Sequence, residues 1–319
     1  GKHIIGAYIG QRSGPTLVAI GSVHGNEPAG AAALVRIAAW LEENRPKING
    51  RIYLLAGNTR AIARRVRYID ADLNRHWTNR NLSGAVMARA DDVVEDKELS
   101  ELQAILDQIL VTAEDEVHVL DLHSTSAEGQ PFATVGDTLR NRTFARKLPV
   151  TILLGIEEQL DGTMLEYLNN MGAVTLGFEG GQHDSDETVG NHESLVMLGL
   201  VNAGILAAAD VPNRPLYRAG LAQRTGGSAI YEVRYRHAIS EIDQFEMDAG
   251  FNNFDPVSAG QRLACDSQGI VTAQERGVVL MPLYQKLGED GFFIGRRIAP
   301  FWLWLSAILR RLGVPSLMP

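Results

Sequence analysis

The sequence predicts an α/β fold, in which a mixed, mostly parallel sheet is flanked by helices and a smaller β-rich domain follows at the C-terminal end. Two observations predict it. Over the first two thirds of the chain, short β-branched runs alternate with longer amphipathic segments, which is typical of layered α/β proteins. From Pro212 to about Pro300 the chain is instead rich in glycine and in short apolar runs such as AIYEVRY, GVVLMPLY and GFFIG.

The elements of the first part follow in order from their hydrophobic patterns. Residues 16–23 (TLVAIGSV) predict a buried strand. Pro28 then opens a helix, because the missing N–H of proline costs nothing at the first helical position. Further strands are expected at residues 51–55, 117–122, 150–154 and 173–178, and further helices at residues 99–110 and 194–209.

Composition shifts place the expected domain boundaries. We predict a catalytic domain over residues 1–211 and a β-rich domain over residues 212–300, which begins in the linker VPNRP. Residues 301–319 begin with FWLWLSAILRRL, which predicts an amphipathic helix packed on its own domain or on a partner subunit of a homo-oligomer. Its apolar stretch is too short to span a bilayer. Attachment to a membrane surface is the weaker alternative, because only Arg310 and Arg311 are cationic there.

Composition also excludes several classes of function. The chain has 319 residues and a formal net charge of −8. We see no long basic run, so we expect neither a nucleic-acid partner nor a membrane partner. Cys265 is the only cysteine, which excludes an intrachain disulfide and a thiolate metal cluster. The lack of disulfides fits a reducing compartment, and we expect a cytoplasmic protein.

Two histidines come directly after predicted buried strands. His24 follows TLVAIGSV, with Glu27 three residues later, and His123 follows VHVLDL. Because the sites of open α/β sheets form at the carboxyl ends of the strands, we expect the three side chains to meet. Two histidines and one carboxylate leave a fourth position open for water, as catalytic zinc sites do. The alternatives are a surface His24 beside a capping Glu27, and a His123 that is buried in the core.

Two further polar features have more than one interpretation. Asp121 shares a strand face with the second histidine and would orient it as a hydrogen-bond acceptor, but we favour an N-cap or a loop anchor. The run RYIDADLNR has the charge density of a solvated loop. Within it, Asn74 and Arg75 are suited to clamp a carboxylate, and Arg67 is suited to lie over a polarised carbonyl.

The segments HGNE, RYIDADLNR, DLHS and GFEGG resemble, in order and spacing, the aspartoacylase/succinylglutamate desuccinylase family, a branch of the zinc-carboxypeptidase fold. The resemblance spans roughly residues 17–183. It implies a zinc-dependent amidohydrolase that removes the acyl group from a small N-acyl amino acid and binds one Zn²⁺ per chain. It implies zinc ligation by His24, Glu27 and His123, carboxylate binding by Asn74 and Arg75, carbonyl polarisation by Arg67, and general base catalysis by Glu179.

Two positions depart from the family's pattern. An arginine that precedes the catalytic glutamate in aspartoacylases falls here near Asn169, and a tyrosine of their C-terminal domain falls in GEDGFFIG, near Phe292 and Phe293. A substrate with a second carboxylate would then lack a partner for that charge. We therefore expect N-acetylaspartate to be a poor substrate and N-acyl derivatives of neutral or longer amino acids to be preferred. The missing cation would otherwise have to come from Arg234, Arg236 or Arg296.

Two other functions use the same residues. A zinc metallocarboxypeptidase acting on short peptides would share the whole site and would differ in having an open groove in place of a closed pocket. A metal-binding scaffold protein without activity would need both Glu179 and Arg67 to be idle. We expect the amidohydrolase.

Overall fold

The structure is a computed structural model that describes residues 3–78, 93–183, 185–225, 227–285 and 287–311. The strands of the first part are β1 (Ile4–Ile9), β2 (Arg12–Gly21), β3 (Asn49–Ala56), β4 (Val117–Thr125), β5 (Phe132–Val135), β6 (Thr151–Leu154) and β7 (Val174–Gln182). Those of the second part are β8 (Ile230–Ala238), β9 (Glu246–Met247), β10 (Pro256–Val257), β11 (Arg262–Asp266), β12 (Gly269–Thr272), β13 (Gly277–Leu280) and β14 (Asp290–Arg297).

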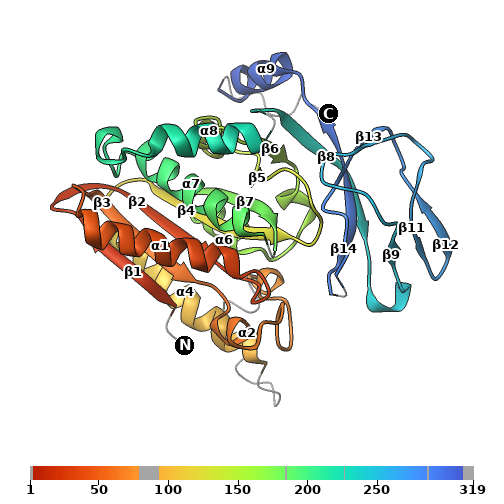
Figure 1. The fold of residues 1–319 in the computed structure, drawn as a ribbon, viewed down its shortest axis with the longest axis horizontal. Helices are drawn as coiled ribbons and strands as arrows, with labels where there is room; N and C mark the ends of the chain where they lie inside the picture. Colours follow the sequence, from red (N-terminus) through yellow and green to blue (C-terminus); the bar gives the residue numbers. More distant parts are fainter. Residues whose placement is uncertain (1–2, 79–92, 184, 226, 286, 312–319) are drawn as a thin grey trace.

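The helices complete the fold shown in Figure 1. The α-helices are α1 (Pro28–Asn44), α2 (Thr59–Arg64), α4 (Val94–Thr112), α5 (Leu139–Ala145), α6 (Met164–Asn170), α7 (Asp186–Asn202), α8 (Arg214–Arg224) and α9 (Pro300–Arg311). Short 3₁₀ turns are η1 (Leu73–Arg75), η2 (Glu157–Gln159), η3 (Ala208–Asp210) and η4 (Glu241–Asp243).

One large sheet runs through both parts of the chain. Its strand order is β1-β3-β2-β4-β7-β5-β6-β8-β14-β13-β10, and β12-β11-β9 form a separate small sheet. The central strands β3, β2, β4 and β7 are parallel neighbours, and so are β5, β6 and β8. The pairs β1–β3, β5–β7, β8–β14 and β13–β14 are antiparallel. The predicted α/β fold with a mixed sheet, mostly parallel at its centre, is confirmed.

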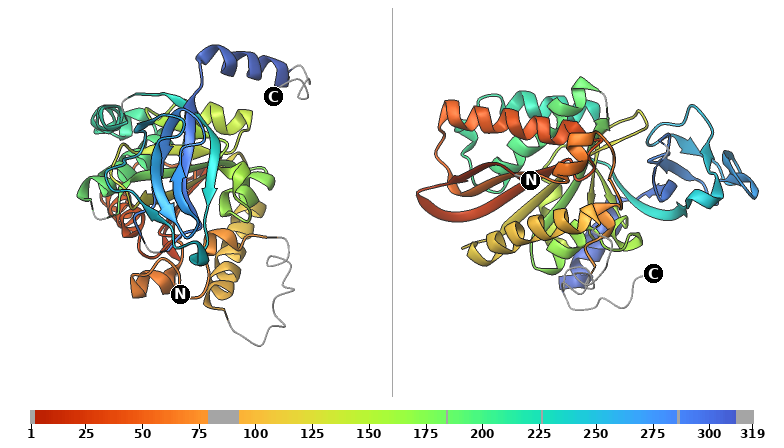
Figure 2. Two further views of the ribbon diagram at one scale, coloured as in Figure 1. Left: turned by 90° about the vertical axis from the view of Figure 1, so that its right-hand side faces the viewer. Right: turned by 90° about the horizontal axis from the view of Figure 1, so that it is seen from below.

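Helices cover both faces of the central strands, as the view from below in Figure 2 shows. In β2, Leu17 and Ala19 face the layer of α1 and α7, whereas Val18 and Ile20 face the layer of α4 and α6. Successive side chains of a strand point to opposite faces. Because both faces are covered at this point, residues 15–21 of β2 and all of β4 are buried continuously rather than at every second position.

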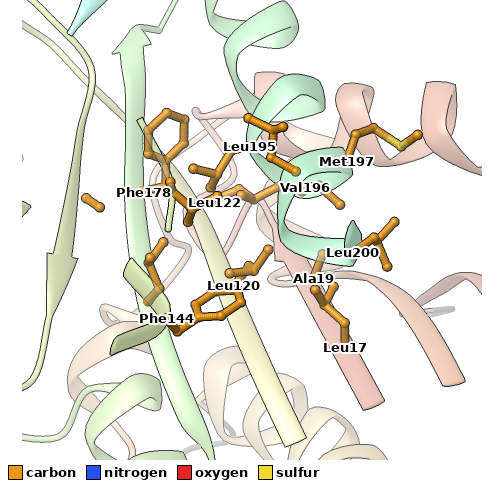
Figure 3. Packing of buried hydrophobic residues seen from close by; sticks show 14 of the residues in the cluster. Leu17, Ala19, Leu120, Leu122, Phe144, Phe178, Leu195, Val196, Met197 and Leu200 are labelled. Atoms are coloured by element: carbon orange, nitrogen blue, oxygen red, sulfur yellow. The ribbon is translucent and has the colours of Figure 1, made fainter. Parts of the chain in front are cut away.

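The packing of α7 on the sheet forms the centre of the larger core (Figure 3). Side chains of β2, β4 and β7 meet the apolar side of this helix and are almost fully buried, which holds the carboxyl ends of the three strands at fixed positions. The residues in contact are Leu17, Ala19, Leu120, Leu122, Phe178, Leu195, Val196, Met197 and Leu200.

The helix expected at residues 194–209 is wrong in both its bounds. The helix α7 begins at Asp186, where the side chain of Ser185 caps it by accepting the N–H of Glu187. Polar residues in its first two turns interrupt the apolar pattern on which the prediction depended. It ends at Asn202, and Gly204 follows with a φ of +80°, a left-handed conformation that favours glycine.

Most strands of the β-rich second part join the large sheet. Strand β8 pairs with β6, so β8, β14, β13 and β10 extend the large sheet. Figure 1 shows β8, β14 and β13 on its right-hand side. Strands β9, β11 and β12 pack a separate small core onto it. Helix α8, which lies beyond the expected boundary at residue 211, packs on α7. The β-rich character of this part is confirmed, while the division into domains stays a prediction.

The end of the described chain is helical, as predicted. Leu303 of α9 packs against the large core, and Arg142 of α5 donates a hydrogen bond to Ser306 at 3.2 Å. The helix therefore contacts the first part of the chain. No helix of the described residues is long and apolar enough to cross a membrane. The large aromatic side chains of α9 are more than half exposed, namely Phe301, Trp302 and Trp304.

Candidate active site

His24, Glu27 and His123 lie together near the carboxyl ends of β2 and β4. The Nδ1 atom of His24 is 2.9 Å from Oε1 of Glu27, and Nδ1 of His123 is 3.2 Å from Oε2 of Glu27. One ligand atom from each residue lies within 4.8 Å of the others. All three side chains are almost fully buried. The structure thus brings together the residues selected from the sequence, and a surface position for His24 is wrong.

Two aspartates hold the outer nitrogens of these imidazoles. Nε2 of His24 is 3.1 Å from Oδ1 of Asp72, and Nε2 of His123 is 2.8 Å from Oδ2 of Asp121. An acceptor at Nε2 keeps the proton there and directs the Nδ1 lone pair inward. Asp121 therefore orients His123, and the favoured interpretation of Asp121 as an N-cap or loop anchor is wrong.

This set of donors fits a divalent metal ion such as zinc. Zinc takes imidazole nitrogen and carboxylate oxygen, and three protein ligands leave one position open. Imidazoles that are oriented by carboxylates through their second nitrogen are typical of such sites. The backbone N–H of Ser124 also donates to Oε2 of Glu27 at 3.0 Å, which fixes the carboxylate that the two imidazoles face.

The loop that carries the first two residues is tight for a local reason. A Cβ atom at Gly25 would lie 2.2 Å from the backbone of Ala61, so only glycine fits between β2 and α2. The N–H of Gly25 donates to the carbonyl of Arg67 at 3.0 Å, and the hydroxyl of Ser22 donates to the carbonyl of Glu27 at 2.8 Å. These contacts turn His24 and Glu27 toward the same point.

The segment RYIDADLNR places Arg67 beside this group. Nη2 of Arg67 donates to Oδ2 of Asp72 at 3.0 Å, and its Nη1 is 3.5 Å from Oε1 of Glu27. Burial raises the pKa of Asp72, but His24 and Arg67 outweigh burial and hold that pKa well below its usual range. An ionised Asp72 thus bridges Arg67 and His24. The guanidinium group is positioned to contact a carbonyl oxygen that approaches the metal-binding group.

Arg75 lines the same cavity but already contacts carboxylates. Its Nη2 is 3.0 Å from Oδ2 of Asp290, and its Nε is 3.5 Å from Oε2 of Glu289. The side chain of Asn74 accepts the N–H of Met164 at 3.0 Å, which leaves its amide nitrogen as the donor end. A substrate carboxylate at Arg75 would therefore share the guanidinium with residues of the second part of the chain.

Glu179 lies in β7, beside His123 in register, and both side chains extend from the same face of the sheet. Its Oε2 atom is buried without a hydrogen-bond partner among the described residues. Burial raises the pKa of Glu179 to about 7. A Cβ at Gly180 would lie 2.6 Å from the ring of His192, so a glycine must follow the glutamate. An unpaired carboxyl group beside His24, Glu27 and His123 is suited to move a proton.

These groups surround one cavity of about 150 Å³. Part of the lining comes from the carboxyl ends of the strands, and another part comes from residues 281–285 and 288–293 of the second part. All seven residues selected from the sequence line the cavity. They are His24, Glu27, Arg67, Asn74, Arg75, His123 and Glu179.

The two positions that depart from the family's pattern have different places. Asn169 does not line the cavity, because its Oδ1 accepts hydrogen bonds from Arg140 at 3.0 Å and Asn141 at 3.1 Å. Phe293 does line the cavity. Phe292 does not line the cavity and lies in the small core of the second part.

None of the arginines considered as substitutes for the missing cation lines the cavity. Arg234 and Arg296 pair with Glu232 on the outer strands. Arg236 contacts a residue of the cavity, since its Nε is 2.5 Å from Oδ1 of Asp290. Arg75 contacts the same carboxylate, so Arg236 is already paired.

Sequence reasoning gave no role in the site to Asp72 or Asp290, and considered Glu157 only as a substitute for Glu179 as the base. Asp72 was part of the charged run without a role of its own. Glu157 follows β6 by three residues, and the rule that selected His24 and His123 from the ends of strands would also have selected it. Asp290 gave no signal, because its place beside the cavity depends on the pairing of β14 with β8.

Comparisons with known proteins agree with this geometry. The family model described as the succinylglutamate desuccinylase/aspartoacylase catalytic domain matches residues 13–201. A search of curated proteins by sequence finds no match. Among solved structures, the chain is similar to the product-bound ectoine utilization protein EutE (DoeB) from Ruegeria pomeroyi, with 21% identity, a TM-score of 0.65, and coverage of 90% of this chain and 87% of the other.

Two further structures show the same fold. The succinylglutamate desuccinylase/aspartoacylase from Rhodobacter sphaeroides is 18% identical, with a TM-score of 0.65 over 92% of this chain and 88% of the other. The succinylglutamate desuccinylase from Chromobacterium violaceum is 15% identical, with a TM-score of 0.62 over 90% of this chain and 86% of the other. Because the family model covers more than half of the sequence, the chain belongs to the succinylglutamate desuccinylase/aspartoacylase family of deacylases.

Proposed function

We propose that the protein is a zinc-dependent amidohydrolase that binds one Zn²⁺ per chain and removes the acyl group from an N-acyl amino acid. The observation that carries the proposal is the placement of the unpaired carboxyl group of Glu179 beside the buried group of His24, Glu27 and His123. Family membership supports hydrolysis of an amide bond. The single cysteine, Cys265, supports a cytoplasmic location.

Each polar residue of the cavity has its own role in the proposed reaction. The two histidines and Glu27 would hold a zinc ion, which would act as a Lewis acid and lower the pKa of the attacking water. Glu179 accepts a proton from the attacking water and returns it to the leaving amine, which cannot depart as an anion. Arg67 donates to the carbonyl oxygen as negative charge develops on it. Asn74 and Arg75 hold the carboxylate of the amino acid and so fix the position of the scissile bond.

The size of the cavity favours this substrate over a peptide. Its volume of about 150 Å³ is below the range of roughly 300–1,000 Å³ that is usual for larger ligands. Residues 281–285 and 288–293 of the second part line one side of the cavity and limit the room for a longer peptide. These observations count against a metallocarboxypeptidase. A scaffold without activity would leave the buried charges of Arg67 and Glu179 without a purpose, although such charges are costly to bury.

The zinc-loaded protein is expected to release free amino acid from N-acetyl or N-succinyl amino acids, and to act poorly on N-acetylaspartate. The second carboxylate of that substrate would meet Glu157, Glu289 and Asp290, while both arginines of the cavity are already paired. The measurement is kcat/KM for N-acetylaspartate beside N-acetylasparagine, which differs only in that charge. A clear preference for the aspartate compound would contradict this view of the pocket, and no release from any N-acyl amino acid would contradict the proposed function.

Changing Arg75 to alanine is expected to raise KM by roughly 10- to 100-fold for substrates with a free α-carboxylate. This factor corresponds to the usual free energy of a hydrogen bond to a charged group. Substrates amidated at that carboxylate should change little, because they present no anion to the guanidinium group. Arg75→Lys is the matched variant, since it keeps the charge and loses the planar fork. Equal losses on both classes of substrate would show that Arg75 serves the structure through Asp290.

A further inference from the structure

Glu95 and Glu98 are two carboxyl groups of helix α4 that are fully buried but do not line the cavity. Neither has a part in the proposed chemistry. Burying a carboxylate is costly unless hydrogen bonds replace those it made with water. Both groups accept such bonds, but from different parts of the chain, and this difference shows what each carboxylate holds in place.

The carboxylate of Glu95 accepts three successive backbone N–H groups from the middle of the segment RYIDADLNR. Its Oε1 accepts the N–H of Ile69 at 2.8 Å, and its Oε2 accepts those of Asp70 at 3.0 Å and Ala71 at 3.2 Å. These three residues belong to no helix or strand. Their N–H groups are therefore paired by one side chain instead of by regular secondary structure, and the carboxylate fixes the path of the segment.

Two residues of the active site lie on either side of this turn. Arg67 precedes it, and its carbonyl accepts the N–H of Gly25 at 3.0 Å. Asp72 follows it directly and bridges Arg67 and His24, at 3.0 Å and 3.1 Å. Because the backbone between Arg67 and Asp72 is held by a single carboxylate, the position of the guanidinium group depends on that carboxylate.

Asn58 connects the same carboxylate with the end of β2. Its Nδ2 donates to Oε1 of Glu95 at 3.0 Å, and its Oδ1 caps α2 by accepting the N–H of Ala61 at 3.0 Å. Its own N–H donates to the carbonyl of Ser22 at 3.0 Å. Ala61 is the residue against which Gly25 packs. The tight loop after β2 and the segment RYIDADLNR are therefore tied to one buried group.

We propose that Glu95 is a positioning residue that acts through Arg67 and keeps the guanidinium group where it polarises the carbonyl of the substrate. The effect on turnover rests on the proposed function, whereas the effect on the segment does not. Glutamine has the same size but only one acceptor oxygen. Each oxygen of Glu95 accepts two of the four N–H donors, so in Glu95→Gln two donors would face another donor and the segment would move.

The kinetic test is a double-mutant cycle of Glu95 and Arg67. Glu95→Gln should keep its zinc and lower kcat by about 10- to 100-fold, because a displacement of about 1 Å in a catalytic group can cost that much. In a protein that carries Arg67→Ala, the same change should cost about threefold or less, since no guanidinium group is left to misplace. The same loss with and without Arg67 would overturn the inference.

Glu98→Gln is the matched control. Glu98 lies three residues further along α4 and is equally buried. It accepts the backbone N–H groups of Thr59 and Arg60, both at 3.0 Å, and these belong to the first turn of α2. The change should lower the melting temperature as Glu95→Gln does, but leave kcat nearly unchanged. An equal loss of kcat in both variants would show that destabilisation, and not the position of Arg67, is the cause.

Amide hydrogen exchange tests the contact itself and needs no turnover. In the wild-type protein the N–H groups of residues 69–71 should exchange slowly although they lie outside helices and strands. They should lose this protection in Glu95→Gln and keep it in Glu98→Gln. Fast exchange in the wild type would overturn the inference even if neither variant folds. If the protein hydrolyses no N-acyl amino acid, the proposed function fails, and the exchange rates still decide whether Glu95 holds the segment.

Discussion

Changing Glu179 to glutamine is expected to lower kcat by about 10²- to 10⁴-fold, the usual contribution of a positioned general acid–base group. An amide neither accepts the proton of the attacking water nor returns one to the leaving amine. The change is isosteric and removes no metal ligand, so the zinc content should stay at one ion per chain. Steady-state kinetics together with elemental analysis measure the two properties separately.

Near-normal turnover in this variant would move the base elsewhere. Of the two glutamates in the turn after β6, Glu157 lines the cavity and Glu158 does not. The turnover of Glu157→Gln and of the double variant would then show whether Glu157 replaces Glu179. Loss of zinc from Glu179→Gln would instead indicate that Glu179 supports the metal-binding group through its neighbour in register, His123.

The second prediction concerns the metal itself. His24→Ala and His123→Ala should each lose the bound zinc and with it the hydrolysis of every substrate, because two remaining ligands do not hold the ion in a site of this type. Each change also leaves an aspartate, Asp72 or Asp121, without the imidazole that it contacts. Elemental analysis of the purified variants gives the zinc content per chain, and circular dichroism shows whether the fold is kept.

His118→Ala is the matched control for these variants. His118 lies on the same strand as His123 and is similarly buried, but it is at the amino end of β4, where it contacts Glu116. Its removal creates a comparable gap and should leave the zinc content unchanged. Full zinc occupancy in both site variants would contradict the assignment of the ligands. Loss of zinc in all three variants would show a general loss of stability.

The sequence brought His24, Glu27 and His123 together because each of them follows a short, local rule, whereas Glu179 and the roles of the arginines came from the resemblance to a known family. His24 and His123 come at the ends of apolar strands, and parallel strands bring their carboxyl ends to one edge of a sheet. Glu27 is fixed to His24 by a loop so tight that Gly25 is required. The fold class follows from the same local periodicity, which decides which face of each strand is buried.

Local rules did not predict the elements whose pattern depends on distant partners. The first turns of α7 are polar because Asn191 and His192 pack under the glycines of β7 rather than into an apolar core. The strand β5 was not expected, since a four-residue run gives little periodicity. Asp121 has the spacing of a cap as much as of an acceptor, and only the tertiary structure shows its contact with His123.

The sequence by itself determined the α/β fold and selected His24, Glu27 and His123 as one group, and its resemblance to a known family added Glu179. Only the tertiary structure decided what the cavity offers to a substrate. The pairing of β8 with β6 brings Asp290 to Arg75, and the turn after β6 brings Glu157 into the cavity, although both are far from the metal-binding group along the chain. Charge in a buried pocket depends on which side chains meet there, and that is set by contacts between residues distant in the sequence.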